Sequence, residues 1–353
     1  MNLPTVNILS KPSTSTSKVD SANFRNRSTA KSEKQHLTNN ILESLSTEQL
    51  KLIKERIRGT KINVLLVGGT GVGKSSTINA LFQNEGKDGG AAAVGDSTRP
   101  ETMGITKYEL NENLIIWDSP GLGDSPDNDA EHSKKIIKAL HQKDENGRPL
   151  IDLVFLILDA GSRDFGSAYS LIEHVITPNL HDDDRDRLLI GLNQADQAMK
   201  GHYWNKIENK PEEKLLERLD ELARTVKNRI REGTGLDVDP IYYSAGCVIE
   251  GERLSEPYNL TKLLSFILEH LPKKKRAVIA EHINQDEANF RHNDDKDDYQ
   301  KRVDTSILSS FLEWTKEVAA GIGDKIKDIL TDPDNIKMAA SVAVGLIKSF
   351  LKK

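Results

Sequence analysis

The chain has 353 residues, of which 37% are hydrophobic and 29% charged, as expected for a soluble protein with one large or two modest domains. A net charge of -5 gives no global reason to expect nucleic-acid binding. The single cysteine, Cys247, excludes an internal disulfide, argues against a cysteine-based metal site and favours a reducing cytoplasm. The N-terminus lacks a signal-peptide core, and no run of about eighteen apolar residues predicts a transmembrane helix.

The N-terminal sixty residues divide into two parts. Residues 1–40 are rich in Ser, Thr, Asn and Lys, and a segment with so little to bury is expected to be disordered. Its basic side chains leave open an alternative in which it tethers the protein to an acidic surface. Residues 41–60 have apolar side chains near helical spacing, and Ser46 with Gln49 resembles a capping box. We expect a helix there that packs on the edge of the following domain.

Strand and helix patterns alternate over residues 61–272, which predicts an α/β fold with a mostly parallel, doubly wound sheet. The expected strands are Lys61–Val67, Thr106–Leu110, Leu114–Trp117, Leu153–Leu158, Leu188–Leu192 and Ile241–Tyr243. The expected helices are Ser75–Phe82, Asp129–Gln142, Ser167–Val175, Pro211–Arg231 and Leu260–Leu271. A tight turn at 111–113 makes the second and third strands an antiparallel hairpin. The motifs below fall at the carboxyl ends of strands, where such sheets bind ligands.

Residues 273–353 are expected to form a helical C-terminal region. The run KKKR at 273–276 opens a polar segment that we expect to be helical as far as about Arg302, with DDKDD at 294–298 in its middle. Both charge runs are interpreted as solvated surface.

The end of the chain has the pattern of an amphipathic helix. Residues 335–353 place Ile336, Ala340, Val344, Ile347 and Leu351 on one side. We expect this face to dock on protein. Binding to a membrane surface through 336–351 stays open as the alternative.

Gly68–Ser75, which reads GGTGVGKS, matches the phosphate-binding loop pattern GxxxxGK[ST] between a buried strand and a helix start. Its glycines allow a tight backbone whose N–H groups converge on an anion at the helix N-terminus. The pattern assigns Lys74 to the β- and γ-phosphates and the Ser75 hydroxyl to Mg²⁺. The alternative is a glycine turn without chemistry.

Three further motifs complete a nucleotide site. Asp118–Gly121, DSPG, has the DxxG spacing in which the aspartate holds Mg²⁺ through water and the glycine N–H binds the γ-phosphate. Asn193–Asp196, NQAD, approximates NKxD, in which the aspartate accepts hydrogen bonds from guanine N1 and N2 and so selects GTP over ATP. Gln194 replaces the lysine that covers the base, so weaker nucleotide binding is expected. Ser244–Gly246, SAG, is placed to offer a backbone N–H to guanine O6.

These motifs, in this order, resemble the Era-like branch of the translation-factor-related GTPases, and most closely the Era-like GTPases of enterobacterial prophages and genomic islands. The resemblance covers residues 61–278. It is carried by WDSPGLGD at 117–124, LDAGSRDFG at 158–166, NQAD at 193–196, IYYSAG at 241–246, PYNL at 257–260 and KKKRAV at 273–278.

The resemblance implies a G domain at 61–272 that binds and hydrolyses GTP with Mg²⁺. It implies phosphate contacts from Gly71, Val72, Gly73, Lys74, Ser75 and Ser76. It places Asp118 and Gly121 near the γ-phosphate, and Asn193, Asp196, Ser244 and Ala245 around the base. A switch threonine should join Ser75 and Asp118 at Mg²⁺. Thr102 is our choice for it, with Thr98 and Thr106 as alternatives, and Lys74, Thr102 and Gly121 form the expected catalytic set.

Two departures from the family pattern matter. Leu122 stands where many small GTPases carry the glutamine that orients water, so slow hydrolysis is expected unless a partner or a dimer helps. Gly71 stands where potassium-activated relatives carry asparagine, which argues against potassium stimulation. Arg163 is interpreted as a surface residue, and a finger across a homodimer is its alternative role.

We therefore expect a cytoplasmic GTPase that acts as a nucleotide-dependent switch. Two alternatives stay open, a guanine-nucleotide-dependent interaction module with little hydrolysis and an assembling GTPase peripheral to a membrane. A glycine-loop RNA-binding signature is lacking after residue 272, so a nucleic-acid role is not supported.

Overall fold

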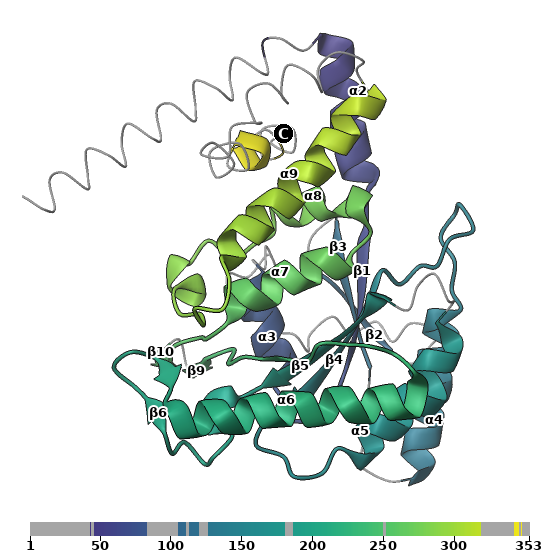
Figure 1. The fold of residues 1–353 in the computed structure, drawn as a ribbon. Helices are drawn as coiled ribbons and strands as arrows, with labels where there is room; N and C mark the ends of the chain where they lie inside the picture. The colour runs from purple at the N-terminus through teal and green to yellow at the C-terminus, as the bar shows by residue number, and fades with distance from the viewer. Residues whose placement is uncertain are drawn as a thin grey trace, which may run out of the picture.

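The computed structural model describes residues 43, 46–82, 105–110, 113–119, 126–180, 186–249, 252–318, 342–345 and 347. Within these residues six strands form one sheet, in the order β2-β3-β1-β4-β5-β8 (Figure 1). The strands are β1 (Ile62–Val67), β2 (Thr106–Glu109), β3 (Leu114–Asp118), β4 (Leu153–Asp159), β5 (Leu188–Asn193) and β8 (Ile241–Tyr242). All neighbours are parallel except β2 and β3. The predicted α/β class and the antiparallel hairpin are confirmed.

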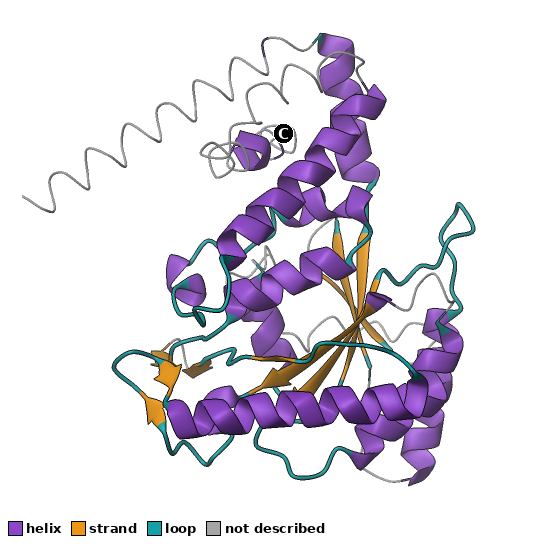
Figure 2. Ribbon diagram, viewed as in Figure 1, coloured by secondary structure: helices purple, strands orange, loops and turns teal. Residues whose placement is uncertain are grey.

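The helices lie on both faces of this sheet (Figure 2). They are α2 (Thr47–Gly59), α3 (Lys74–Leu81), α4 (Pro126–Leu140), α5 (Gly166–Leu171), α6 (Glu213–Thr234), α7 (Leu260–His270), α8 (Arg276–Ile279) and α9 (Tyr299–Val318). Short turns of 3₁₀-helix are η2 (Thr177–Asn179), η4 (Ala195–Gln197), η5 (Lys273–Lys275) and η6 (Glu287–Phe290). A π-helical turn, η1 (Ile172–Ile176), continues α5, so the helix expected at 167–175 is split in two.

Two small hairpins were not predicted from the sequence. One pairs β6 (Trp204–Asn205) with β7 (Lys210–Pro211), and the other pairs β9 (Cys247–Ile249) with β10 (Glu252–Ser255). Figure 1 places β6, β9 and β10 together at one end of the molecule. Strands of two to four residues are too short to leave an alternating pattern in the sequence, which explains why they were missed.

Alternate residues of the central strands pack in two separate hydrophobic cores, one on each face of the sheet. In β1, Val64 and Leu66 pack in a cluster with apolar residues of α2, α3, α7 and α9. Leu65 and Val67 pack on the opposite face with residues of α4, α5 and α6. All six residues of β1 are buried, because a parallel strand covered on both faces has no solvent side.

Helix α2 begins at the predicted capping box. The Ser46 Oγ accepts from the Gln49 N–H at 3.2 Å, and the Gln49 side chain accepts from the Ser46 N–H at 2.9 Å. Ile53 and Ile57 of this helix are buried in the core that α9 shares. The Asn113 side chain, at the start of β3, donates to the Ile57 carbonyl at 2.9 Å. These contacts attach α2 to the sheet.

The polar segment after Pro272 differs from the expectation. Most of the residues between α8 and α9 are not helical, and η6 is the one helical turn among them. The interpretation of the charge runs as solvated surface holds for Lys273 and for 295–298, which are exposed. It is wrong for Lys275, which pairs with the buried Asp152, and for Asp294, whose side chain is only 7% exposed. Buried partners far away in the chain are invisible in a local charge pattern.

The described part of the last helix packs on protein. Ile347, one of the residues expected on the apolar face, is buried in the core that also contains residues of α2 and α9, and Val344 packs against this core, which supports docking of this face on protein. The expected tail at 1–40 lies outside the described residues, and the domain boundary at 272 stays a prediction. In the described part of the chain, no helix has the length and apolarity needed to cross a membrane.

Candidate nucleotide-binding site

The loop between β1 and α3 has the backbone of a phosphate-binding loop. Gly73 is the N-cap of α3 and has a φ of +85°, a left-handed conformation that favours glycine. A Cβ added there would lie 2.3 Å from the Asn193 Nδ2. Gly68 is equally confined, because a Cβ on it would lie 2.4 Å from the Ile157 carbonyl oxygen of β4. Close approach to β4 and β5 therefore requires glycine at both positions.

Lys74, the first residue of α3, reaches back over this loop. Its Nζ donates to the carbonyl oxygens of Gly68 at 3.0 Å and Gly69 at 3.2 Å. Ser75 and Ser76 follow in the first turn of the helix. The loop thus combines a positively charged group with a helix N-terminus, the elements that bind an anion.

Asp118 ends β3, the strand next to β1, and pairs in register with Leu66. Its Oδ1 is buried and accepts no hydrogen bond from the described residues. Burial raises the pKa of this carboxyl to about 6, and the positive charge of Lys74 opposes the shift. A buried carboxylate oxygen that accepts no hydrogen bond from the described residues and lies within electrostatic range of Lys74 suits Mg²⁺, which prefers oxygen ligands. These residues fit the expected ion.

Asn193, the last residue of β5, joins the phosphate loop to the loop after β8. Its Nδ2 donates to the Val72 carbonyl at 2.9 Å, and its Oδ1 accepts from the Ala245 N–H at 3.0 Å. The next residue, Gln194, donates from Nε2 to the Gly71 carbonyl at 2.9 Å. The two motifs, about 120 residues apart, are therefore in direct contact.

Asp196 lies in η4 and is only 8% exposed, and its Oδ2 accepts from the Gln197 side chain at 2.7 Å. Next to it is a cavity of about 490 Å³ whose lining includes Lys200, Trp204 and Arg253. The volume is within the range of small-molecule sites.

Residue 244 follows β8 closely and is held by backbone hydrogen bonds. The Ser244 N–H donates to the Tyr258 carbonyl at 3.0 Å, and the reverse bond is 2.9 Å. Just before it, the buried Tyr243 hydroxyl lies 2.8 Å from the Thr77 Oγ1 of α3. This contact was not predicted from the sequence. The one signal in the sequence was a tyrosine in a strand expected to be buried, because a buried tyrosine hydroxyl needs a hydrogen-bond partner.

A family model described as a 50S ribosome-binding GTPase matches residues 63–194, which include the phosphate loop, Asp118 and Asn193. The sheet order, the glycine loop and this family match all indicate the same fold. The chain contains a domain with the P-loop GTPase fold.

The relatives of this GTPase domain cover only part of the chain. Translocase of chloroplast 108 from Physcomitrium patens is 33% identical over 123 residues, 35% of this chain. Cell division control protein 10 from Saccharomyces cerevisiae is 34% identical over 99 residues, 24% of this chain and 30% of that protein. The chain spans 12–13% of the length of the chloroplast translocases that it matches.

A similar solved structure is Toc33 from Arabidopsis thaliana in complex with GDP and Mg²⁺. The two chains are 16% identical, the alignment covers 71% of this chain and 96% of that one, and the TM-score is 0.41.

Not every expected residue of the GTPase domain is described. Thr98, Thr102, Gly121 and Leu122 lie outside the described residues. Thr106, the third switch candidate, lies in β2 opposite Asp118. Arg163, after β4, is exposed in a turn in which the Asp164 N–H donates to the Ser162 Oγ at 3.2 Å, in line with a surface role.

Proposed function

We propose that the protein binds GTP and GDP with Mg²⁺, hydrolyses GTP and acts as a nucleotide-dependent switch. The observation that supports this best is the position of Asn193, whose amide contacts the phosphate loop on one side and the Ala245 N–H on the other. A nucleotide bound there would have its phosphates on the loop of 68–75 and its base beside Asp196.

Guanine would be selected by one hydrogen-bond acceptor and one hydrogen-bond donor of the protein. The Asp196 carboxylate would accept from guanine N1 and N2, and adenine offers no such pair of donors. Guanine O6 would share the Ala245 N–H that now donates to the Asn193 Oδ1. Ser244 would support that loop through its bonds to Tyr258.

The phosphates would be held by the backbone N–H groups of the loop at Gly71, Val72 and Gly73 and by the start of α3 at Ser75 and Ser76. The Lys74 ammonium, now bound to the Gly68 and Gly69 carbonyls, would turn to the β- and γ-phosphates. Ser75, Asp118 and the switch threonine, for which we propose Thr102, would hold Mg²⁺. When bound, this ion neutralises charge that develops on the phosphate oxygens.

Hydrolysis would be slow in the isolated chain. The Gly121 N–H would meet the γ-phosphate, but Leu122 has no group to orient the attacking water. This residue favours a second candidate function, a guanine-nucleotide-dependent interaction module with little hydrolysis. A homodimer or an activating protein could supply the missing group.

The experiment that tests both candidates measures binding of GTP, GDP and ATP with Mg²⁺ and then phosphate release over many turnovers. Guanine-selective binding with release supports the GTPase, and binding without release supports the interaction module. Loss of base selectivity would contradict the roles of Asn193 and Asp196.

Within the wider family, we propose the Era-like GTPases of enterobacterial prophages and genomic islands as the nearest group, on the motifs quoted above. We propose a cytoplasmic location, on the single cysteine, with peripheral membrane binding through 336–351 as the alternative. Burial of Ile347 in the protein core argues against that alternative. Co-sedimentation with liposomes in either nucleotide state would support it.

A further inference from the structure

The segment between α8 and α9 contacts two parts of the nucleotide site at once. We call residues 283–299 the brace. Its first contacts are with the C-terminal end of α3, whose last carbonyls have no partner within the helix. The Asn284 N–H donates to the Leu81 carbonyl at 2.9 Å, and the Asn284 side chain donates to the Asn79 carbonyl at 3.0 Å. The Asn289 side chain donates to the Ala80 carbonyl at 3.0 Å. The brace thus caps the helix that starts at the phosphate loop.

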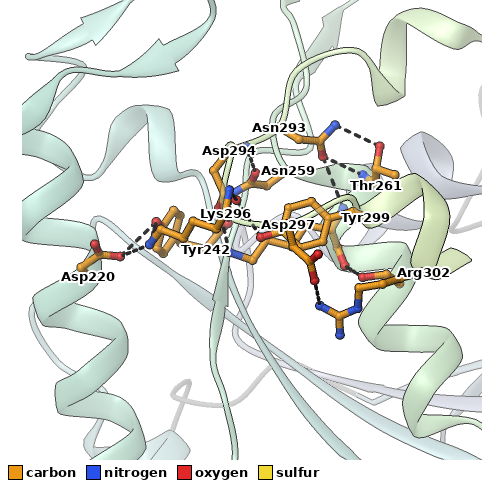
Figure 3. Close-up of polar contacts among 12 residues, drawn as sticks. Asp220, Tyr242, Asn259, Thr261, Asn293, Asp294, Lys296, Asp297, Tyr299 and Arg302 are labelled. Carbon is orange, nitrogen blue, oxygen red and sulfur yellow. Dashed lines mark hydrogen bonds and ion pairs between the residues drawn. The ribbon is translucent and has the colours of Figure 1, made fainter.

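Its second set of contacts centres on Asn259, the N-cap of α7, which is fully buried and has a φ of +59° (Figure 3). The Asn259 Nδ2 donates to the Tyr242 carbonyl of β8 at 3.1 Å. Its Oδ1 accepts from the Asp294 N–H at 2.8 Å, and its own N–H donates to the His292 carbonyl at 2.8 Å. One side chain therefore connects the brace to the strand that leads into Ser244.

Asp294 keeps this end of the brace in place. Its side chain is 7% exposed and accepts from the Lys262 Nζ at 2.7 Å and from the Tyr299 hydroxyl at 2.6 Å. Figure 3 also shows Lys296, whose Nζ lies 2.9 Å from the Asp220 carboxylate and 3.1 Å from the Tyr242 hydroxyl. The pair of Lys262 and Asp294 has low exposure, and hydrogen bonds between such charged groups are stronger than neutral ones; the pair of Lys296 and Asp220 is more exposed and contributes less.

We propose that the brace is a positioning element of the nucleotide site, and that Asn259 and Asp294 are the residues through which it fixes the Ser244–Gly246 loop. This inference rests on the proposed binding of guanine nucleotide. One end of the brace holds α3, which starts at the phosphate loop, and the other end holds β8, which leads to the loop expected to meet guanine O6. A segment outside residues 63–194 therefore sets the spacing between the phosphate and base subsites.

The variant that tests this is Asn259→Gly. Glycine adopts a φ of +59° without strain, so the backbone bonds to His292 and Leu263 are kept while the side-chain links to Tyr242 and Asp294 are lost. Displacement of the Ala245 N–H would weaken GDP binding by about tenfold, the loss expected for one buried hydrogen bond.

Two nucleotide ratios separate positioning from general destabilisation. The preference for GDP over 6-thio-GDP reports the O6 contact and is expected to fall in Asn259→Gly. The preference for GDP over IDP reports the 2-amino contact with Asp196 and is expected to stay. The matched control is Glu269→Gln. Glu269 of α7 pairs with Arg302 of α9, with 2.8 Å between the Arg302 Nε and the Glu269 Oε1, so this change weakens that ion pair and leaves the contacts of Asn259 in place. It should lower the melting temperature and leave both ratios unchanged.

Should Asn259→Gly not fold, Asp294→Asn decides, because it keeps the shape and removes the charge that pairs with Lys262. In Asp294→Asn the preference for GDP over 6-thio-GDP should also fall. One outcome is a wild-type protein that selects guanine and folded variants that match its GDP affinity and both nucleotide ratios to within about twofold. That outcome would overturn this inference and leave the proposed function intact. A wild-type protein without guanine selectivity would overturn the proposed function and the inference with it.

Discussion

At the scale of single residues, Gly73 links the phosphate loop to the base motif. Gly73→Ala is expected to weaken GDP binding by well over tenfold, because the new methyl group would displace the Asn193 side chain that lies 2.3 Å from its position. The measurement is GDP affinity by titration calorimetry, with thermal unfolding in parallel.

The matched control for Gly73 is Gly71→Ala in the same loop. Gly71 has a φ of +79°, so alanine there has the same left-handed penalty of about 1–2 kcal/mol, but nothing lies within 4 Å of its Cβ. A smaller loss of GDP affinity is expected. Equal losses in the two variants would show that backbone strain, and not the Asn193 contact, is responsible.

Asp118 is a second residue with a measurable signature, the pH dependence of stability. Its pKa is raised from 3.8 to about 6 by burial, so the folded protein binds this proton more tightly than the unfolded chain. The buried charge therefore lowers the free energy of unfolding above about pH 6, and this cost is relieved as the pH falls from about 6 to about 4. The shift corresponds to at most about 3 kcal/mol.

The check is the free energy of unfolding of wild type and Asp118→Asn without nucleotide from pH 4 to 8. The free energy of unfolding of Asp118→Asn should exceed that of wild type by less as the pH falls. A difference that stays constant or grows would contradict the raised pKa of Asp118. Affinity for GTP with Mg²⁺ should decrease below about pH 6, because the ion requires the deprotonated carboxylate.

At the scale of elements, the run at 273–276 is a structural attachment. The Lys275 Nζ lies 2.7 Å from the carboxylate of Asp152, which also accepts from the Asn63 N–H of β1 at 2.9 Å. Burial raises the pKa of Asp152 although Lys275 opposes the shift. Lys275→Met should lower the free energy of unfolding by about 3–5 kcal/mol, because it leaves a buried carboxylate without its cation.

Lys273 provides the control in the same run. It pairs with Glu313 at 3.3 Å, and its side chain is 56% exposed. Lys273→Met should therefore cost less than about 1 kcal/mol in a chemical denaturation experiment. Similar values for the two variants would mean that the Asp152 pair does not attach the C-terminal region to the sheet.

At the scale of the whole molecule, the proposed activity predicts slow turnover. With leucine at position 122, phosphate release by dilute protein is expected on the order of 10⁻³ per second or slower, as in small GTPases without their activators. Arg163 lies in an exposed turn between Ser162 and Asp164, so Arg163→Ala is expected to have the same turnover as wild type at all protein concentrations. If GTP turnover rises with protein concentration in wild type but not in Arg163→Ala, Arg163 would instead act as a finger across a homodimer.

The sequence alone determined what depends on neighbours in the chain. Val64 to Val67 form a strand because a continuous apolar run suits a buried parallel strand. Ser46 begins α2 because its capping partner is three residues away. The phosphate loop was predictable for the same reason, since its glycines, Lys74 and Ser75 lie in one continuous stretch, Gly68–Ser75.

Only the tertiary structure decided which distant residues meet. Asn193 reaches Val72 across 121 positions, and Asn289 caps α3 across 209. In the sequence, Asp294 and Lys275 have the pattern of a solvated surface, because a local charge run does not reveal whether a buried partner exists elsewhere. Burial and pairing are set by how the sheet and helices pack, which is why the motifs were predicted and the brace was not.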